Sequence, residues 1–226
     1  EGLALTFKAY AIQKEPFADA AAAWEIKDAQ VVTNTELLQG ALSEQEIAIG
    51  ADFTVNTQLN TEYNMADGAV LNLAGHTLTV PHMQAIFQGK DVTIKNGTMV
   101  MDSTGSYPLF IGNGTQETTA TVENMHLVGG VNAYVADVVL KDCYIDASDF
   151  LYYAVWADEG ATITIESGTY ISGSSGKAVS VAQKDAAVIV KGGTFNSDVS
   201  QYMADGYQMT TSTDDAGVTW YTVIPA

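Results

Sequence analysis

Short stretches in which apolar and polar residues alternate recur along the chain. They are found at 71–73, 92–94, 163–165 and 188–190. A period of two is typical of β-strands that bury one side. Turn-forming pairs follow these stretches, among them Asn96-Gly97, Ser167-Gly168 and Gly192-Gly193, and such pairs supply the positive φ that a sharp bend requires. The pattern predicts many short strands joined by tight turns.

Six copies of a short pattern divide most of the chain. Each copy has an apolar anchor, a charged or small residue, a turn-forming residue, and a second apolar residue five positions after the anchor. The anchors are Leu73, Ile94, Val122, Leu140, Ile165 and Val190, with successive separations of 21, 28, 18, 25 and 25 residues. One coil of a solenoid takes about 20–30 residues and stacks only on its neighbours. We therefore predict an all-β, right-handed parallel β-helix, since right-handed crossovers predominate between parallel strands.

Both ends of this solenoid have sequences that can close it. Residues 35–42 predict a short amphipathic helix with Thr35 as its N-cap, which would cover the strand edges at the open end. Near the C-terminus, turn-forming residues around Gly206 and Gly217 bracket a predicted hairpin. The β-helix is accordingly expected to span residues 31–226, with the hairpin as its C-terminal cap.

Residues 1–30 form a separate N-terminal segment in this prediction. Residues 3–10 alternate as an extra strand whose apolar side carries Leu3, Leu5 and Phe7. Because this strand belongs to no coil, we expect it to require a partner strand. Addition to another copy of the chain is therefore the candidate route to self-assembly.

Residues 35–42, 47–55 and 71–79 together resemble the entry into pectin-lyase-like right-handed β-helix regions of bacterial surface proteins. Residues 191–199 with 204–207 resemble the closing stretch of such regions. The resemblance covers residues 31–226 and implies an architecture rather than an activity, because this superfamily includes both enzymes and adhesin stalks. The opening stretch 5–17, followed by 21–24, resembles the last strand and tail of a camelysin-type domain, from a family of secreted and fibre-forming proteins of Gram-positive bacteria. Together the resemblances imply a secreted or cell-surface bacterial protein.

The balance of charge excludes some partners. The chain has 27 acidic residues against nine lysines, lacks arginine altogether, and has a net charge of −18. Nucleic-acid binding requires a basic patch that displaces phosphate counterions, and binding to anionic lipid requires the same sign of charge. No stretch approaches the ~18 apolar residues of a membrane span. We therefore expect neither nucleic-acid binding nor membrane insertion.

The lone cysteine and the histidines predict no special chemistry. Cys143 cannot form an internal disulfide, and its apolar flanks predict a packed side chain. His76 and His126 fall two coils apart, a separation of roughly 10 Å that is too large for one zinc ion, and the histidines are expected at the surface. His126 and Tyr144 also interrupt a column formed by Thr77, Thr98, Thr169 and Thr194, which argues against a flat ice-binding face.

The enzymatic motifs of familiar β-helices are missing. Polygalacturonase-like enzymes use a set of paired carboxylates with a histidine, and pectate lyases use calcium with an arginine base. None of the first set occurs in order here, and the chain has no arginine. The sequence predicts no catalytic residue and no required cofactor.

Two weaker candidate sites lie in one part of the chain. Asp142, Asp146 and Asp149 belong to the densest group of acidic residues, and calcium binds six to eight oxygen ligands. Tyr153 and Trp156 lie in an aromatic run nearby and are candidates for stacking on a sugar ring. The alternative for the carboxylates is a set of solvated turn residues, and for the aromatic residues a half-buried strand.

Two functions therefore remain open. The first is a non-catalytic structural or adhesive module of a secreted or cell-surface protein, which self-assembles through its N-terminal strand. The second is a β-helix that binds or cleaves an acidic or neutral surface polysaccharide on the face near residues 146–156.

Overall fold

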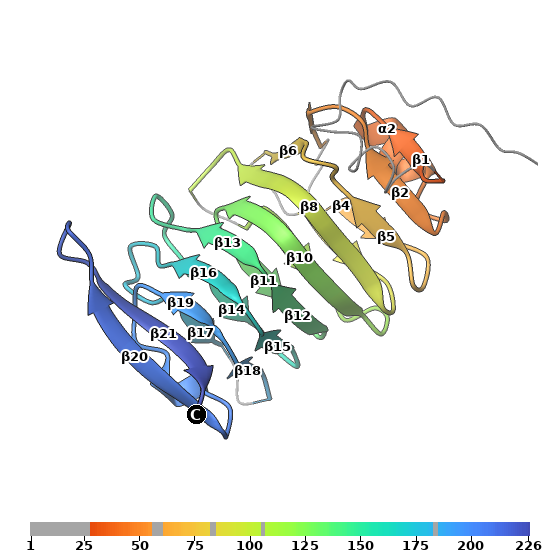
Figure 1. Ribbon diagram of the computed structural model, residues 1–226. Helices are drawn as coiled ribbons and strands as arrows, with labels where there is room; N and C mark the ends of the chain where they lie inside the picture. Colours follow the sequence, from red (N-terminus) through yellow and green to blue (C-terminus); the bar gives the residue numbers. More distant parts are fainter. Residues whose placement is uncertain (1–27, 56–60, 82–84, 105–106, 183–184) are drawn as a thin grey trace, which may run out of the picture.

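The chain forms a parallel β-solenoid of about six turns, which confirms the predicted fold class (Figure 1). The computed structural model describes residues 28–55, 61–81, 85–104, 107–182 and 185–226. The predicted extra strand at 3–10, with Leu3, Leu5 and Phe7, lies outside the described residues. In the part of the chain that is described, no helix is long and apolar enough to cross a membrane.

Each turn of the solenoid contributes strands to three faces, which we call face 1, face 2 and face 3. Face 1 is built from β2 (Glu46–Ile49), β5 (Val70–Asn72), the first part of β8 (Val92–Met101), the first part of β10 (Thr119–Val128), β12 (Asp137–Lys141), β15 (Thr162–Ile165) and β18 (Ala187–Val190). Face 2 is built from β3 (Phe53–Thr54), β6 (Thr77–Val80), the second parts of β8 and β10, β13 (Cys143–Asp146), β16 (Gly168–Ile171) and β19 (Gly193–Phe195). Face 3 is built from β4 (Thr61–Asn64), β7 (Ala85–Gln88), β9 (Leu109–Ile111), β11 (Val131–Ala133), β14 (Val155–Ala157) and β17 (Val179–Val181).

The strand register confirms five of the six predicted anchors and corrects the first. Ile94 pairs with Leu71 rather than with Leu73, whereas Leu78 and Met99 pair as expected. The first coil therefore has two more residues between its paired positions than the next coil has. They are absorbed in a bend at Ala74, whose N–H donates to the side chain of Asn72.

The bend between face 1 and face 2 has the backbone conformation that the turn-forming residues predict. Asn96, Asn124 and Asp142 have φ values of 61°, 50° and 49°, in the left-handed region that asparagine and aspartate tolerate. Their side chains also bond from coil to coil: Asn124 Nδ2 donates to Asn96 Oδ1 at 3.0 Å, and Ser167 Oγ donates to Asp142 Oδ1 at 2.8 Å. The bend residues thus stack as a polar ladder.

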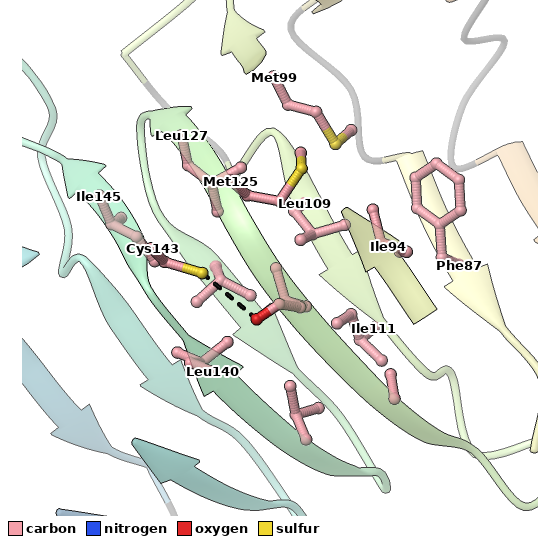
Figure 2. Close-up of a cluster of buried hydrophobic side chains, with 14 of the residues drawn as sticks. Phe87, Ile94, Met99, Leu109, Ile111, Met125, Leu127, Leu140, Cys143 and Ile145 are labelled. Atoms are coloured by element: carbon pink, nitrogen blue, oxygen red, sulfur yellow. Dashed lines mark hydrogen bonds between the residues drawn. The ribbon is translucent and has the colours of Figure 1, made fainter. Parts of the chain in front are cut away.

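The three faces enclose one continuous apolar core. Figure 2 shows part of it, with Ile94, Leu127 and Leu140 pointing into the same interior as Cys143. Cys143 is buried, its thiol donates to the carbonyl of Val122 at 3.4 Å, and burial raises its pKa to about 11. Such a thiol stays protonated at neutral pH, which confirms the prediction of a packed side chain.

The N-terminal end is covered by a helix, as predicted, although the N-cap differs. Helix α2 (Thr35–Gly40) buries Leu38, and Asn34 is the N-cap, because its side chain accepts a hydrogen bond from Leu37 N–H. Thr35 instead donates its hydroxyl proton to the carbonyl of Thr54. Strand β1 (Gln30–Val32), which the sequence pattern did not predict, pairs in parallel with β2.

The C-terminal end is closed by the predicted hairpin. A short 3₁₀ helix, η1 (Ser200–Tyr202), precedes strands β20 (Tyr207–Thr213) and β21 (Thr219–Pro225). β21 pairs antiparallel with β19 on one side and with β20 on the other. The parallel stack therefore ends in two antiparallel strands.

Candidate functional site

Four aromatic rings gather beside face 3 and form what we call the ring cluster: Tyr107, Tyr152, Tyr153 and Trp156. Tyr107 stacks on Tyr152 with ring centroids 5.8 Å apart and lies 5.7 Å from Trp156. Trp156 is 6.2 Å from Tyr152 and 6.1 Å from Tyr153. These separations lie in the range at which aromatic rings attract one another.

The ring cluster joins coils that are not adjacent. Tyr107 precedes β9, whereas Trp156 lies in β14, and β11 separates these two strands. Gly130, immediately before β11, makes the contact possible, because a Cβ atom at this position would lie only 2.7 Å from Cδ1 and Cε1 of Tyr107. The ring of Tyr107 therefore passes over a coil that has no side chain at the crossing point.

Asn132 of β11 lies on the outer side of face 3, next to the ring cluster. In the strand register it is flanked by Phe110 and Trp156, while Val131 and Ala133 point into the core. Asn132 is nevertheless fully buried, and neither its amide nitrogen nor its amide oxygen has a hydrogen-bond partner. A buried amide without partners costs free energy, so it requires a physical explanation.

The hydroxyl of Tyr107, a member of the ring cluster, is a third buried polar atom without a partner. It is buried and approaches the backbone of Tyr153, but completes no hydrogen bond of normal geometry. Burial raises the pKa of this hydroxyl, so it stays neutral and able to donate. Among the described residues, five buried side-chain polar atoms lack partners, and three of these belong to Tyr107 and Asn132.

The ring cluster is open to solvent on one side. Tyr152 is 38% exposed and the neighbouring Leu151 is 58% exposed, while Tyr153 and Trp156 are half-buried. The structure thus brings together the two residues predicted to stack on a sugar, and adds Tyr152 and Tyr107. The ring cluster thus combines partly exposed rings with buried polar atoms of Tyr107 and of Asn132, the strand neighbour of Trp156.

The three candidate calcium ligands do not converge. Asp142 is a bend residue whose carboxylate is bonded to Ser167, and Asp146 accepts a hydrogen bond from the backbone of Ser148. Together with Asp149 they form no group of carboxylates suited to a metal, and no group of three or more His, Cys, Asp or Glu elsewhere in the described ranges does so. Calcium binding to this chain stays a prediction to which the geometry assigns no site.

The expectation of surface histidines holds for His126 and is wrong for His76. His126 is exposed and packs edge-on against Tyr144 at 5.1 Å. His76 is buried, and its Nδ1 lies 3.0 Å from a carboxylate oxygen of Asp52. The two extra residues of the first coil place His76 in the bend rather than on the outer surface. His82 lies outside the described residues.

Comparisons with known proteins assign no family. No family model, curated protein or solved structure matches the chain. The structure itself shows a parallel β-solenoid, and the two family resemblances stay predictions.

Proposed function

We propose that this chain is a non-catalytic adhesive module of a secreted or cell-surface bacterial protein, and that its ring cluster binds a neutral glycan. The observation that carries this proposal is the combination of partly exposed rings with unpartnered buried polar atoms at Asn132 and Tyr107. Ligand sites commonly combine aromatic walls with a few polar groups that fix orientation.

The chemistry of the ring cluster matches that of a sugar. The C–H face of a pyranose ring is apolar and can stack on Tyr152 or Trp156, whose rings lie 21° from parallel. Sugar hydroxyls both donate and accept hydrogen bonds, and the Asn132 amide offers a donor group and an acceptor. Tyr152 is the most exposed ring of the four and offers the first stacking surface.

The charge of the chain favours a neutral glycan over a uronic acid polymer. Asp149 lies in the same loop as Tyr152, and the net charge of the whole chain is −18. Carboxylates along a polyuronate would be repelled by this field. Neutral polysaccharides avoid that repulsion.

A paired substitution tests the proposal. Tyr152→Ala should weaken binding to the preferred glycan about tenfold, since it removes a stacking surface. The matched control is Tyr144→Ala, because Tyr144 is 43% exposed but lies on face 2, away from the ring cluster. Binding would be measured by calorimetry after a screen of neutral, amino and uronic polysaccharides.

Three results would contradict the proposal. These are retention of no glycan by the wild-type chain, equal losses for Tyr152→Ala and Tyr144→Ala, and the release of new reducing ends. The last result would indicate an enzyme rather than an adhesive module.

Self-assembly through Leu3, Leu5 and Phe7 remains the structural part of the expected function. The alternating pattern of residues 3–10 supports it. Deleting residues 1–12 should lower the mass that the chain reaches at high concentration, because assembly through this strand is lost. An unchanged monomer at all concentrations of the intact chain would contradict strand exchange.

A further inference from the structure

The hairpin at the C-terminal end leaves one strand with an open edge. β20 is the outermost strand of its sheet and lies at the end of the stack (Figure 1). One of its edges pairs with β21 along all seven residues. No strand of the described ranges pairs with the other edge.

The sequence of β20 lacks the features that usually protect such an edge. Exposed edge strands are commonly short, or carry charged residues or proline, because unpaired backbone groups recruit other strands. β20 reads Tyr-Gln-Met-Thr-Thr-Ser-Thr, with no charge and no proline. This is notable in a chain with a net charge of −18.

The hairpin geometry identifies which backbone groups face outward. Hydrogen bonds from Asp214 N–H to Val218 at 3.0 Å and from Ala226 N–H to Gly206 at 2.9 Å mark the two ends of the hairpin. In an antiparallel pair, residues alternate between bonding inward and bonding outward. The even-numbered residues of β20 therefore bond to β21, and the odd-numbered residues direct their N–H and C=O groups to the open edge. These are Tyr207, Met209, Thr211 and Thr213.

We propose that this edge pairs with the same edge of a second copy of the chain, around a two-fold axis at Thr210. An antiparallel strand is complementary to itself under two-fold symmetry, because each outward donor meets an outward acceptor of the other copy. Tyr207 pairs with Thr213 of the second copy and Met209 pairs with Thr211, which gives about eight backbone hydrogen bonds. The two Thr210 side chains meet on the axis.

Charge favours a second copy at this edge over other positions on the chain. Two molecules that each carry a charge of −18 can approach most closely where the surface is uncharged. The nearest acidic residues, Asp205, Asp214 and Asp215, lie beyond the two ends of β20, and the proposed register places Asp205 opposite Asp215 of the second copy. Dimerisation should therefore strengthen as salt concentration rises.

The test compares two substitutions at one position in the full chain. Thr211→Pro removes an outward N–H and leaves the hairpin bonds in place, since proline is tolerated at strand edges. It should raise the dissociation constant of the dimer about thirtyfold, because each dimer loses two hydrogen bonds. Thr211→Ala keeps the N–H and should dimerise like the wild-type chain. Mass would be measured by light scattering and sedimentation over a range of concentrations and salt.

Circular dichroism and the melting temperature establish that each variant is folded, and Thr213→Pro replaces Thr211→Pro if the latter is not. A wild-type chain that stays monomeric up to millimolar concentration would overturn the proposal. So would a dimer that survives both proline substitutions. A dimer lost on deletion of residues 1–12 but retained by Thr211→Pro would place the interface at the N-terminal strand instead.

Discussion

The outer row of face 2 and the outer row of face 3 are produced by the same coils but differ in what covers them. Along face 2 the row runs Thr77, Thr98, His126, Tyr144, Thr169 and Thr194, and none of its members is buried. Along face 3 the row runs Ile86, Phe110, Asn132, Trp156 and Ser180, and Ile86 and Asn132 are buried.

The difference shows how one side of a repeat architecture comes to be covered. On face 2 an outer side chain can contact its neighbour in the next coil, as His126 does with Tyr144. On face 3 the ring of Tyr107 crosses an entire coil at Gly130 to reach Trp156. The repeat alone produces the outer row of face 2, which we call the open row. The outer row of face 3, which we call the covered row, requires a gap at a glycine in one coil and a large side chain in another.

The largest expected effect comes from closing that gap. Gly130→Ala places a methyl group against the ring of Tyr107 and the backbone carbonyl of Tyr153, and overpacking of this kind costs about 2 kcal/mol. We expect the free energy of unfolding, measured by urea denaturation, to fall by that amount. Glycan binding should weaken as well, since the rings must separate.

A second glycine serves as the control. Gly40 is the last residue of α2, and a Cβ atom at this position would have no other atom within 4 Å, so Gly40→Ala meets no obstacle. This substitution should leave the free energy of unfolding unchanged or raise it by up to about 1 kcal/mol. Equal effects of the two substitutions would show that Gly130 is not a crossing point.

The next effect concerns the buried amide of Asn132, beside Trp156 in the strand register. Asn132→Leu replaces an unpartnered amide with an apolar group of similar size, and removing such a desolvated group should raise the free energy of unfolding by about 1 kcal/mol. Glycan binding should be lost in the same variant. A loss of stability would instead show that the amide has a partner in the folded protein, and would separate Asn132 from the proposed site.

The sequence predicted the solenoid because its signals are local and repeated. Each coil repeats an alternating strand, a turn-forming pair and an apolar residue at a fixed distance. The fold class is therefore predicted correctly even where one coil is misaligned. The error at Leu73 illustrates this. Leu73 is itself buried, and only the register shows that Leu71 is the residue stacked on Ile94.

The candidate site was predicted only in part because half of it is not local. Tyr153 and Trp156 stand close together in an aromatic run, which is visible in the sequence. Tyr107 lies 49 positions before Trp156, in a loop outside the repeat pattern, and the intervening coil length hides their proximity. Asn132 had one visible signal, a polar residue between Val131 and Ala133, but an outward position in a strand explains such a residue equally well.

A smaller effect is expected where charges alternate on the outside of face 1. Lys141 Nζ lies 3.4 Å from Glu166, and the two side chains are 41% and 42% exposed. Exposed pairs of this kind contribute about 0.5 kcal/mol. A double-mutant cycle with Lys141→Met and Glu166→Gln should give that coupling at low salt and nearly none at about 1 M salt. A coupling energy above about 2 kcal/mol between Lys141 and Glu166 would contradict this expectation, because it would exceed that of an ordinary exposed ion pair.

The smallest effect tests the polar contact at the start of the open row. Asp52 accepts hydrogen bonds from Thr77 N–H at 2.9 Å and from His76 at 3.0 Å, and these bonds hold its pKa below the ordinary value. A lowered pKa in the folded state stabilises the protein above the unfolded pKa of about 3.9, and this contribution is lost as the pH falls through the folded value.

Because the Asp52 side chain is 69% exposed, solvent screening should hold that contribution below about 0.5 kcal/mol. Asp52→Asn keeps the acceptor for Thr77 but removes the titration. Its melting temperature should therefore lie slightly below that of the wild-type chain at about pH 6, and the two should converge by about pH 2. If the two melting curves coincide at every pH, the charge of Asp52 contributes nothing to the stability of the protein.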